Sequence, residues 1–110
     1  ARKIRAKLVL ELANGPTTPE GEAVLRKRGI PIIPDVLANS GGVTTSYFEW
    51  LQNIRGERWS EDAVLEKLAR LLRKQTSEVL ALATRKRCTL RDAAFALALK
   101  RLATEIRPHE

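Results

Sequence analysis

The sequence has few of the residues that mark secreted, membrane-spanning or metal-binding proteins. Its 110 residues include one cysteine, Cys88, which excludes an internal disulfide, and one histidine, His109, which has no companion ligands for a metal. No run approaches the roughly 18 apolar residues that a membrane span requires. The basic start of the chain is not followed by an apolar leader segment. We therefore expect one small, soluble domain in the cytoplasm.

A dinucleotide-binding fingerprint is also missing, because no G-x-G-x-x-G run is present. Hydrophobic residues make up 44% of the chain, and there are only five prolines and six glycines. This composition is ordinary for a globular protein and argues against disorder. A chain of this length can bury a core if its elements complete one another, but it cannot hold two full domains.

The surplus of positive charge is not organised as a nucleic-acid site. Twenty Lys and Arg oppose thirteen Asp and Glu, for a net charge of +7. The sequence has no helix-turn-helix pattern, zinc spacing or paired RNA-stacking aromatics. The basic groups lie at residues 2–7, 26–28, 70–74 and 85–87. We interpret them as solvated faces and helix C-termini, where cations complement the helix dipole, and expect neither nucleic acid nor membrane as a partner.

The first part of the chain predicts two short parallel strands joined by a helix. Residues 7–12 are short and aliphatic, as in a buried strand. Thr17 or Thr18 then caps a helix that Gly29 ends. Residues 30–34 predict a second strand, shortened by two prolines that cannot donate to a ladder. The strand-helix-strand order predicts a right-handed parallel pair.

The remainder of the chain predicts three helices, over residues 43 to 53 or 55, about 60–84 and 89 to about 108. The first has Tyr47, Trp50, Leu51 and Ile54 at helical spacing on one face. The fold class is therefore α/β, a partial Rossmann-like domain with short parallel strands followed by a C-terminal helical segment. Residues 1–58 are expected to form the second half of a dinucleotide-binding domain, and residues 59–110 the helices that pack on it.

Two asparagines and a helix start are the main candidates for ligand binding. Asn14 and Asn39 follow the predicted strands, and ligands of open parallel sheets bind at the carboxyl ends of strands. A carboxamide donates and accepts at once, although each asparagine could instead form a local turn. Gly41 and Gly42 open a helix whose N–H groups attract anions. Ser46, one turn later, could reach such an anion or bond its own backbone.

Other reactive side chains are weaker candidates. Asp35 and Glu49 are acid or base candidates, but neither has a second titrating group at a recognisable spacing. For Cys88 a half-buried structural thiol fits better than a reactive one. His109 lies in the C-terminal tail, where disorder is expected.

Two blocks of the sequence resemble the glutamate dehydrogenase branch of the Glu/Leu/Phe/Val dehydrogenase family. The family's E-x-A-N-G-P-T-T-P-E block is present at residues 11–20, and P-D-x-x-A-N-A-G-G-V-x-x-S-Y at residues 34–47. Residues 89–99 look like a weaker version of the family's last helix. Ser40 departs from the family's usual alanine and adds a hydroxyl near the expected pocket.

The resemblance implies roles for five residues. Asn14 corresponds to a residue near the nicotinamide ring, and Asn39 to one that contacts the cofactor and the substrate region. Gly42 and Val43 would line the substrate pocket. Ser46 would match the serine that binds the side-chain carboxylate of glutamate. The implied cofactor is NAD or NADP, and the implied substrates are glutamate and 2-oxoglutarate.

The family's substrate domain, catalytic lysine and aspartate, and glycine-rich turn are expected N-terminal to Ala1. We therefore interpret the chain as a C-terminal piece of an enzyme that deaminates L-glutamate oxidatively to 2-oxoglutarate and ammonia with NAD(P), incompetent alone, in a homo- or hetero-oligomer with dehydrogenase subunits. Two alternatives stay open. One is a non-catalytic regulatory or interaction subunit that docks on a complete dehydrogenase, and the other is a basic binding module.

Overall fold

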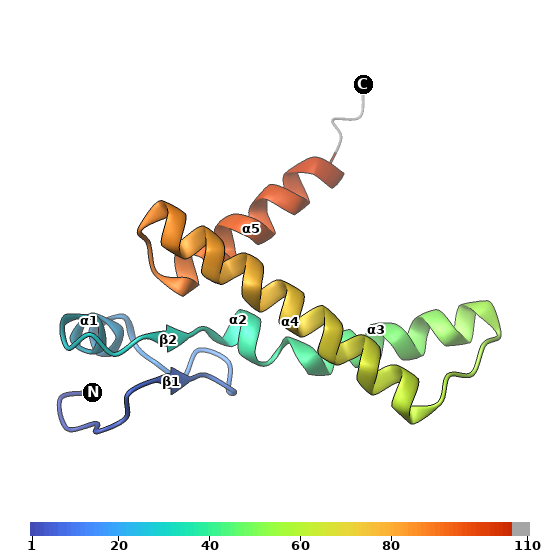
Figure 1. The fold of residues 1–110 in the computed structure, drawn as a ribbon, viewed down its shortest axis with the longest axis horizontal. Coiled ribbons are helices and arrows are strands. Elements are labelled where there is room, and N and C mark those ends of the chain that lie inside the picture. The colour runs from blue at the N-terminus through green and yellow to red at the C-terminus, as the bar shows by residue number, and fades with distance from the viewer. Residues whose placement is uncertain (107–110) are drawn as a thin grey trace.

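The computed structural model describes residues 1–106, so His109 lies outside the described residues. Two short parallel strands and a helix form one end of the molecule, and a long helix crosses from them to the opposite end (Figure 1). The elements are, in chain order, β1 (Val9–Leu10), α1 (Pro19–Lys27), β2 (Ile32–Ile33), α2 (Asp35–Ala38), α3 (Ser40–Arg55), α4 (Glu61–Lys86) and α5 (Leu90–Glu105). The predicted fold class, short parallel strands followed by helices, is confirmed.

The parallel pair is shorter than the sequence predicted. Val9 pairs with Ile32 and Leu10 with Ile33, in place of strands over residues 7–12 and 30–34. The bonds from Val9 N to Pro31 O (3.0 Å) and from Glu11 N to Ile33 O (3.1 Å) extend the ladder. Prolines flank β2 on both sides and have no N–H to donate, which limits the ladder to its centre.

Helix α1 begins and ends as its sequence dictates. The Thr18 hydroxyl accepts from Gly21 N at 3.1 Å, which makes Thr18 rather than Thr17 the cap. Gly29 adopts a left-handed φ of +70° after the last turn, and the following N–H, of Ile30, bonds back to Leu25 O. Leu25 is buried against Ile30 and Ile32, so α1 is fixed to β2 by an apolar cluster.

The helix predicted from residue 43, which is α3 in the structure, begins three residues earlier than expected, at Ser40 rather than Val43. A short helix, α2, precedes it, because Pro34 O accepts from both Leu37 N and Ala38 N. The apolar side chains predicted to share one face of α3 are mostly exposed. Tyr47, Trp50 and Ile54 are exposed, while Leu51 is partly buried.

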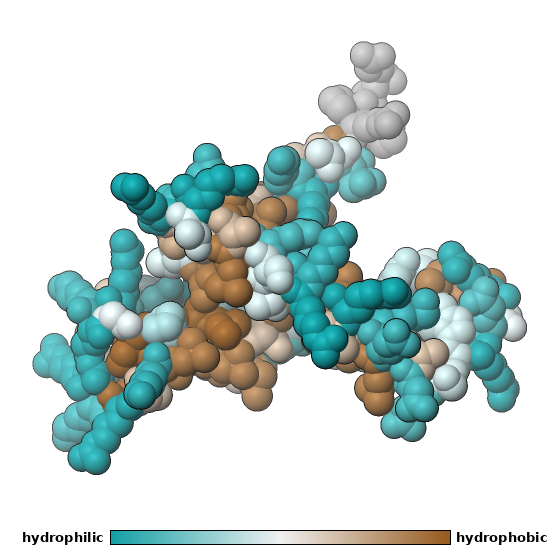
Figure 2. All heavy atoms as spheres, viewed as in Figure 1, coloured by the Kyte–Doolittle hydropathy of each residue, from teal (hydrophilic) through white to brown (hydrophobic). Residues whose placement is uncertain are grey.

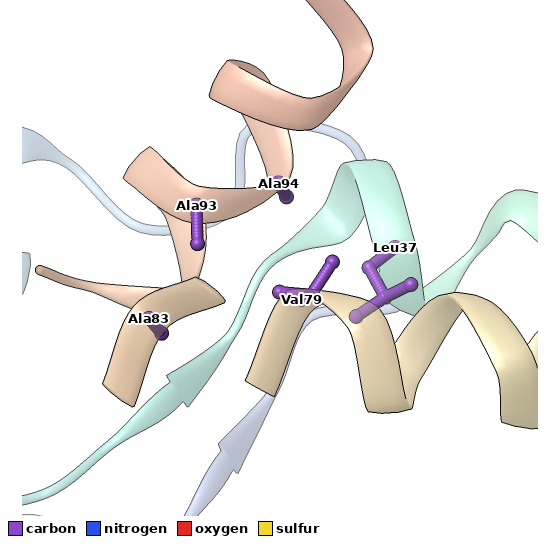
Figure 3. Close-up of a cluster of buried hydrophobic side chains, with 5 residues drawn as sticks. All are labelled: Leu37, Val79, Ala83, Ala93 and Ala94. Carbon is purple, nitrogen blue, oxygen red and sulfur yellow. The ribbon is translucent and has the colours of Figure 1, made fainter. Parts of the chain in front are cut away.

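Helices α4 and α5 pack closely because small residues meet at their crossing. Both begin at the predicted caps: the Ser60 hydroxyl accepts from Ala63 N, and the Thr89 hydroxyl from Asp92 N. The central apolar cluster is small and consists of Leu37, Val79, Ala83, Ala93 and Ala94 (Figure 3). It joins α2, α4 and α5. Cys88 is half-buried and packs against it, as expected of a structural thiol.

The molecule is open for its length. Its radius of gyration is 16.9 Å, against about 13 Å for a compact domain of this size. One face carries a continuous band of hydrophobic residues between hydrophilic ends (Figure 2). Within residues 1–106, no helix has both the length and the apolar character needed to cross a membrane. The division of the chain at residue 58 stays a prediction.

Candidate functional site

The two predicted asparagines lie side by side. Asn14 follows β1 and Asn39 links α2 to α3, and Asn39 Nδ2 donates to Asn14 Oδ1 at 2.6 Å and to Leu12 O at 3.3 Å. Within residues 1–106, no hydrogen bond engages Asn14 Nδ2 or Asn39 Oδ1. The pair therefore keeps one amide donor and one amide acceptor for a ligand.

The predicted substrate residues form a surface that starts at Asn39. Residues three and four apart share a helix face, so Asn39, Gly42, Val43 and Ser46 follow one another along the first two turns of α3. Gly42, Val43 and Ser46 are all exposed, Val43 to 71%. This stretch of helix is open to solvent, as one wall of a pocket would be without its opposite wall.

The serine hydroxyls of this region are engaged locally. Ser46 Oγ donates to Gly42 O at 3.1 Å, and Ser40 Oγ donates to Leu37 O at 2.7 Å. Ser40, which replaces the family's usual alanine, therefore bonds the backbone of α2. Ser46 keeps its oxygen lone pairs accessible on the exposed side of the helix.

A cluster of charges that was not predicted is bonded, through Asp35, to the segments that carry the asparagines. Arg91, on α5, forms ion pairs with Glu11 (2.8 Å), Glu22 (2.9 Å) and Asp35 (3.3 Å). The Glu11 side chain is only 1% exposed, and its Oε2 also accepts from Asp35 N at 3.0 Å. Buried charges are tolerated when they are paired and hydrogen-bonded in this way.

The surroundings of Glu11 and Asp35 lower the pKa of both carboxyl groups. Burial acts to raise the pKa of Glu11, but hydrogen bonds from Thr17, Arg91 and the backbone of Asp35, with the charge of Arg91, outweigh it and leave the pKa below its usual value of 4.5. Backbone N–H bonds from Gly15 and Val36, and then Arg91, lower the pKa of Asp35. Glu11 and Asp35 are therefore charged at neutral pH.

A comparison with known protein families identifies the chain. The model of the Glutamate/Leucine/Phenylalanine/Valine dehydrogenase family matches residues 1–109. The chain belongs to this family.

Two bacterial members of the dehydrogenase family are similar in sequence. A cryptic catabolic NAD-specific glutamate dehydrogenase of Bacillus subtilis is 48% identical over 103 residues, which cover 94% of this chain and 24% of the relative. The NAD-specific glutamate dehydrogenase of Staphylococcus aureus is 47% identical over 107 residues, which cover 97% of this chain and 26% of the relative. The chain thus spans about a quarter of the length of these relatives.

Solved dehydrogenase structures have the same fold over this stretch. Glutamate dehydrogenase from Peptoniphilus asaccharolyticus is 49% identical, with a TM-score of 0.88. The match covers 93% of this chain and 26% of the chain in that structure. The hetero-hexameric glutamate dehydrogenase of Thermus thermophilus, in its Leu-bound form, is 36% identical, with a TM-score of 0.92. The match covers 99% of this chain and 26% of the chain in that structure.

One feature of the sequence indicates the charge cluster around Arg91. Glu11 is a charged residue within an aliphatic strand pattern, which indicates a buried partner. That partner, Arg91, is 80 residues away, so no local spacing reveals it. Asp35, an acid or base candidate from the sequence, is instead ion-paired and bonded to the backbone. Glu49, the other candidate, is exposed on α3.

Proposed function

We propose that this chain is the C-terminal segment of an NAD-dependent glutamate dehydrogenase and contributes one wall of the site for nicotinamide and glutamate. The contact between Asn14 and Asn39 carries the proposal, because it joins the two residues that the family resemblance links to the cofactor. The naming of relatives 47–48% identical as NAD-specific glutamate dehydrogenases supports NAD over NADP.

The asparagine pair suits a primary carboxamide. Nicotinamide carries a C=O that accepts and an NH₂ that donates, which complements the remaining donor of Asn14 and the remaining acceptor of Asn39. Holding that group fixes the rotation of the ring and thus the face that it presents to the substrate. Hydride transfer depends on this orientation, since NAD supplies the hydride-accepting carbon and the protein supplies its alignment.

Ser46 is proposed to bind the side-chain carboxylate of glutamate. The start of α3 favours negative charge, because the N–H groups of its first turn point toward the N-terminal end. The Ser46 hydroxyl now donates to Gly42 O, and it would turn to donate to the carboxylate instead. A hydrogen bond to a charged group is stronger than one between neutral groups, so this exchange is favourable.

The Ser46→Ala variant, made in the full-length dehydrogenase that contains this chain, tests the proposal. A hydrogen bond to a charged group is worth about 1.5–3 kcal/mol, so we expect kcat/KM for glutamate to fall by about 10- to 150-fold. Activity toward norvaline, whose side chain has no carboxylate, should change little. Steady-state kinetics with both amino acids measures the difference.

Thr45→Ala is the matched control, because Thr45 Oγ1 bonds to Gly41 O and Gly42 O one position earlier on the same helix. This variant should affect glutamate and norvaline equally. An equal loss for both amino acids in Ser46→Ala would instead assign Ser46 to the structure of the helix start.

A non-catalytic subunit that docks on a complete dehydrogenase is the second candidate. It is favoured by two exposed apolar stripes. One lies on α3 and is formed by Val43, Tyr47, Trp50 and Ile54, and the other lies along α5 and its C-cap and is formed by Phe95, Leu99, Leu102 and Ile106. The two candidates differ in what the isolated chain does. A docking subunit would change the activity of a complete dehydrogenase when added to it, whereas a segment of the enzyme would not.

A further inference from the structure

We propose that Asp35, held in place by Arg91, is a positioning residue for the Asn14–Asn39 pair. The inference rests on the proposed role of that pair in binding nicotinamide. It adds a specific claim, that helix α5 controls the geometry of an asparagine pair with which, within residues 1–106, it forms no hydrogen bond.

Asp35 bonds to both segments that carry the asparagines. Its carboxylate Oδ2 accepts from Gly15 N at 2.8 Å, which fixes the turn next to Asn14. Its backbone carbonyl accepts from Asn39 N at 3.0 Å, which fixes the backbone of the second asparagine. The distance between the two amide side chains therefore depends on where Asp35 lies.

Asp35 is in turn anchored by groups from distant parts of the chain. Arg91 Nη1 donates to Asp35 Oδ1 at 3.3 Å, and Glu11 Oε2 accepts from Asp35 N at 3.0 Å. Arg91 and Glu11 also bond to each other at 2.8 Å. This triangle ties α5, the end of β1 and the start of α2 together. Such mutual bonding holds side chains in one arrangement, which is what a preorganised binding site requires.

The two carboxylates Glu22 and Asp35 both pair with Arg91, but they differ in whether they also bond to the segments that carry the asparagines. Glu22, on α1, pairs with the same arginine at 2.9 Å. Within residues 1–106, the Glu22 side chain forms no hydrogen bond to the segments of Asn14 or Asn39. Glu22 and Asp35 therefore form a matched pair: both are half-buried carboxylates on Arg91, but only Asp35 connects to the asparagines.

The test compares Asp35→Asn with Glu22→Gln in the full-length dehydrogenase. Each change neutralises one carboxylate that pairs with Arg91 and conserves side-chain size. The readout is the ratio of the dissociation constants of NAD and ADP-ribose, measured by calorimetry, because ADP-ribose lacks the nicotinamide. A misplaced amide pair weakens only the nicotinamide contact, so Asp35→Asn should raise the ratio by about three- to tenfold. Glu22→Gln should leave the ratio unchanged.

A second readout separates positioning from simple loss of stability. When the nicotinamide is misaligned, hydride transfer slows, and the isotope effect on kcat with 2-deuterated glutamate should rise in Asp35→Asn. Loss of folded enzyme would lower the active fraction without changing that isotope effect. Where Asp35→Asn gives too little folded enzyme, Arg91→Lys keeps the charge, loses the fork-shaped guanidinium and should show the same changes.

Asn39→Ala separates this inference from the proposed function. If Asn39→Ala raises the ratio and Asp35→Asn does not, the asparagines bind nicotinamide but Asp35 does not position them, and the inference is overturned. If Asn39→Ala leaves the ratio unchanged, the proposed role of the pair fails, and the inference fails with it. Equal rises in Asp35→Asn and Glu22→Gln would also overturn it, since they would indicate general loosening of the cluster.

Discussion

Glu11 is a carboxylate enclosed next to the parallel strands. Its side chain is 1% exposed and lies 2.8 Å from Arg91. Removing one partner of a buried pair leaves the other charge without compensation, which is costly. The ion pair between Glu11 and Arg91 therefore helps to fix the position of α5. Ion pairs on the surface would do so less, because water screens them.

Stability should depend on pH through this cluster. The folded-state pKa values of Glu11 and Asp35 lie below their unfolded values of 4.5 and 3.8. Groups with a lowered pKa add stability above the unfolded pKa, and this stability is lost as pH falls through the folded pKa. We expect the urea midpoint to be steady from neutral pH down to about pH 5 and to fall below that.

The Glu11→Gln variant should be destabilised by about 1–3 kcal/mol at neutral pH, because it weakens the charge-assisted hydrogen bonds between Glu11 and the partly buried Arg91, which keeps Glu22 and Asp35 as partners. Its urea midpoint should also fall less steeply than the wild-type midpoint between pH 5 and pH 3. Equilibrium urea unfolding at several pH values measures both. Parallel pH profiles for the variant and the wild type would contradict the account of this ion pair.

The sequence could predict the asparagines but not their support. Asn14 and Asn39 follow strands of one parallel pair, and this placement was sufficient to predict that they share an edge. The contacts of Arg91 join residues 56 to 80 positions apart, and only the folded chain brings these together. Ion pairs between residues so far apart in the chain follow no helical or strand periodicity, so the sequence alone does not indicate them.

At the scale of elements, the termini of the helices follow local chemistry closely. The caps Thr18, Ser60 and Thr89 all accept from a backbone N–H of the first turn. The exception is the start of α3, where the Gly41-Gly42 pair suggested a later beginning. The chain is already helical from Ser40, since α2 leads into α3 through Asn39. Tertiary contact with α4 overrides the low helix propensity of glycine here.

The junction between α4 and α5 carries a residue that its conformation does not suit. Arg87 adopts a left-handed φ of 53° at the end of α4, where glycine has no steric penalty. Arg87→Gly should therefore stabilise the protein by up to about 1 kcal/mol. Lys86→Gly, one residue earlier at the last helical position of α4, should instead destabilise it, by at most about 1 kcal/mol. Thermal unfolding compares the two, and a loss of stability in Arg87→Gly would show that its side chain has a compensating role.

At the scale of the whole molecule, much of the apolar surface of residues 1–106 is exposed. The side chains of Leu8, Leu10 and Leu12 are exposed beside β1, and stripes on α3 and α5 are exposed as well. Of the two stripes, the sequence predicted the one on α3 as a helix face but could not determine what covers it. A short two-stranded sheet has open edges, which favour pairing with further chain.

The isolated chain should therefore associate with itself and should have no glutamate dehydrogenase activity. It lacks a G-x-G-x-x-G turn, and its candidate site is one open wall. Light scattering over a wide concentration range measures the association, and NAD reduction with glutamate measures the activity. Steady turnover by a preparation free of host dehydrogenase, or a monomer at all concentrations, would contradict this prediction.

The central claim is that these residues supply a competent wall of a glutamate dehydrogenase site. A chimera tests it most directly, in which the chain replaces the matching 26% of the Staphylococcus aureus NAD-specific enzyme. We predict NAD-dependent oxidation of glutamate with kcat/KM within about tenfold of the parent, a cost below about 1.4 kcal/mol. A chimera with the parent's size and melting temperature that fails to oxidise glutamate would contradict the claim.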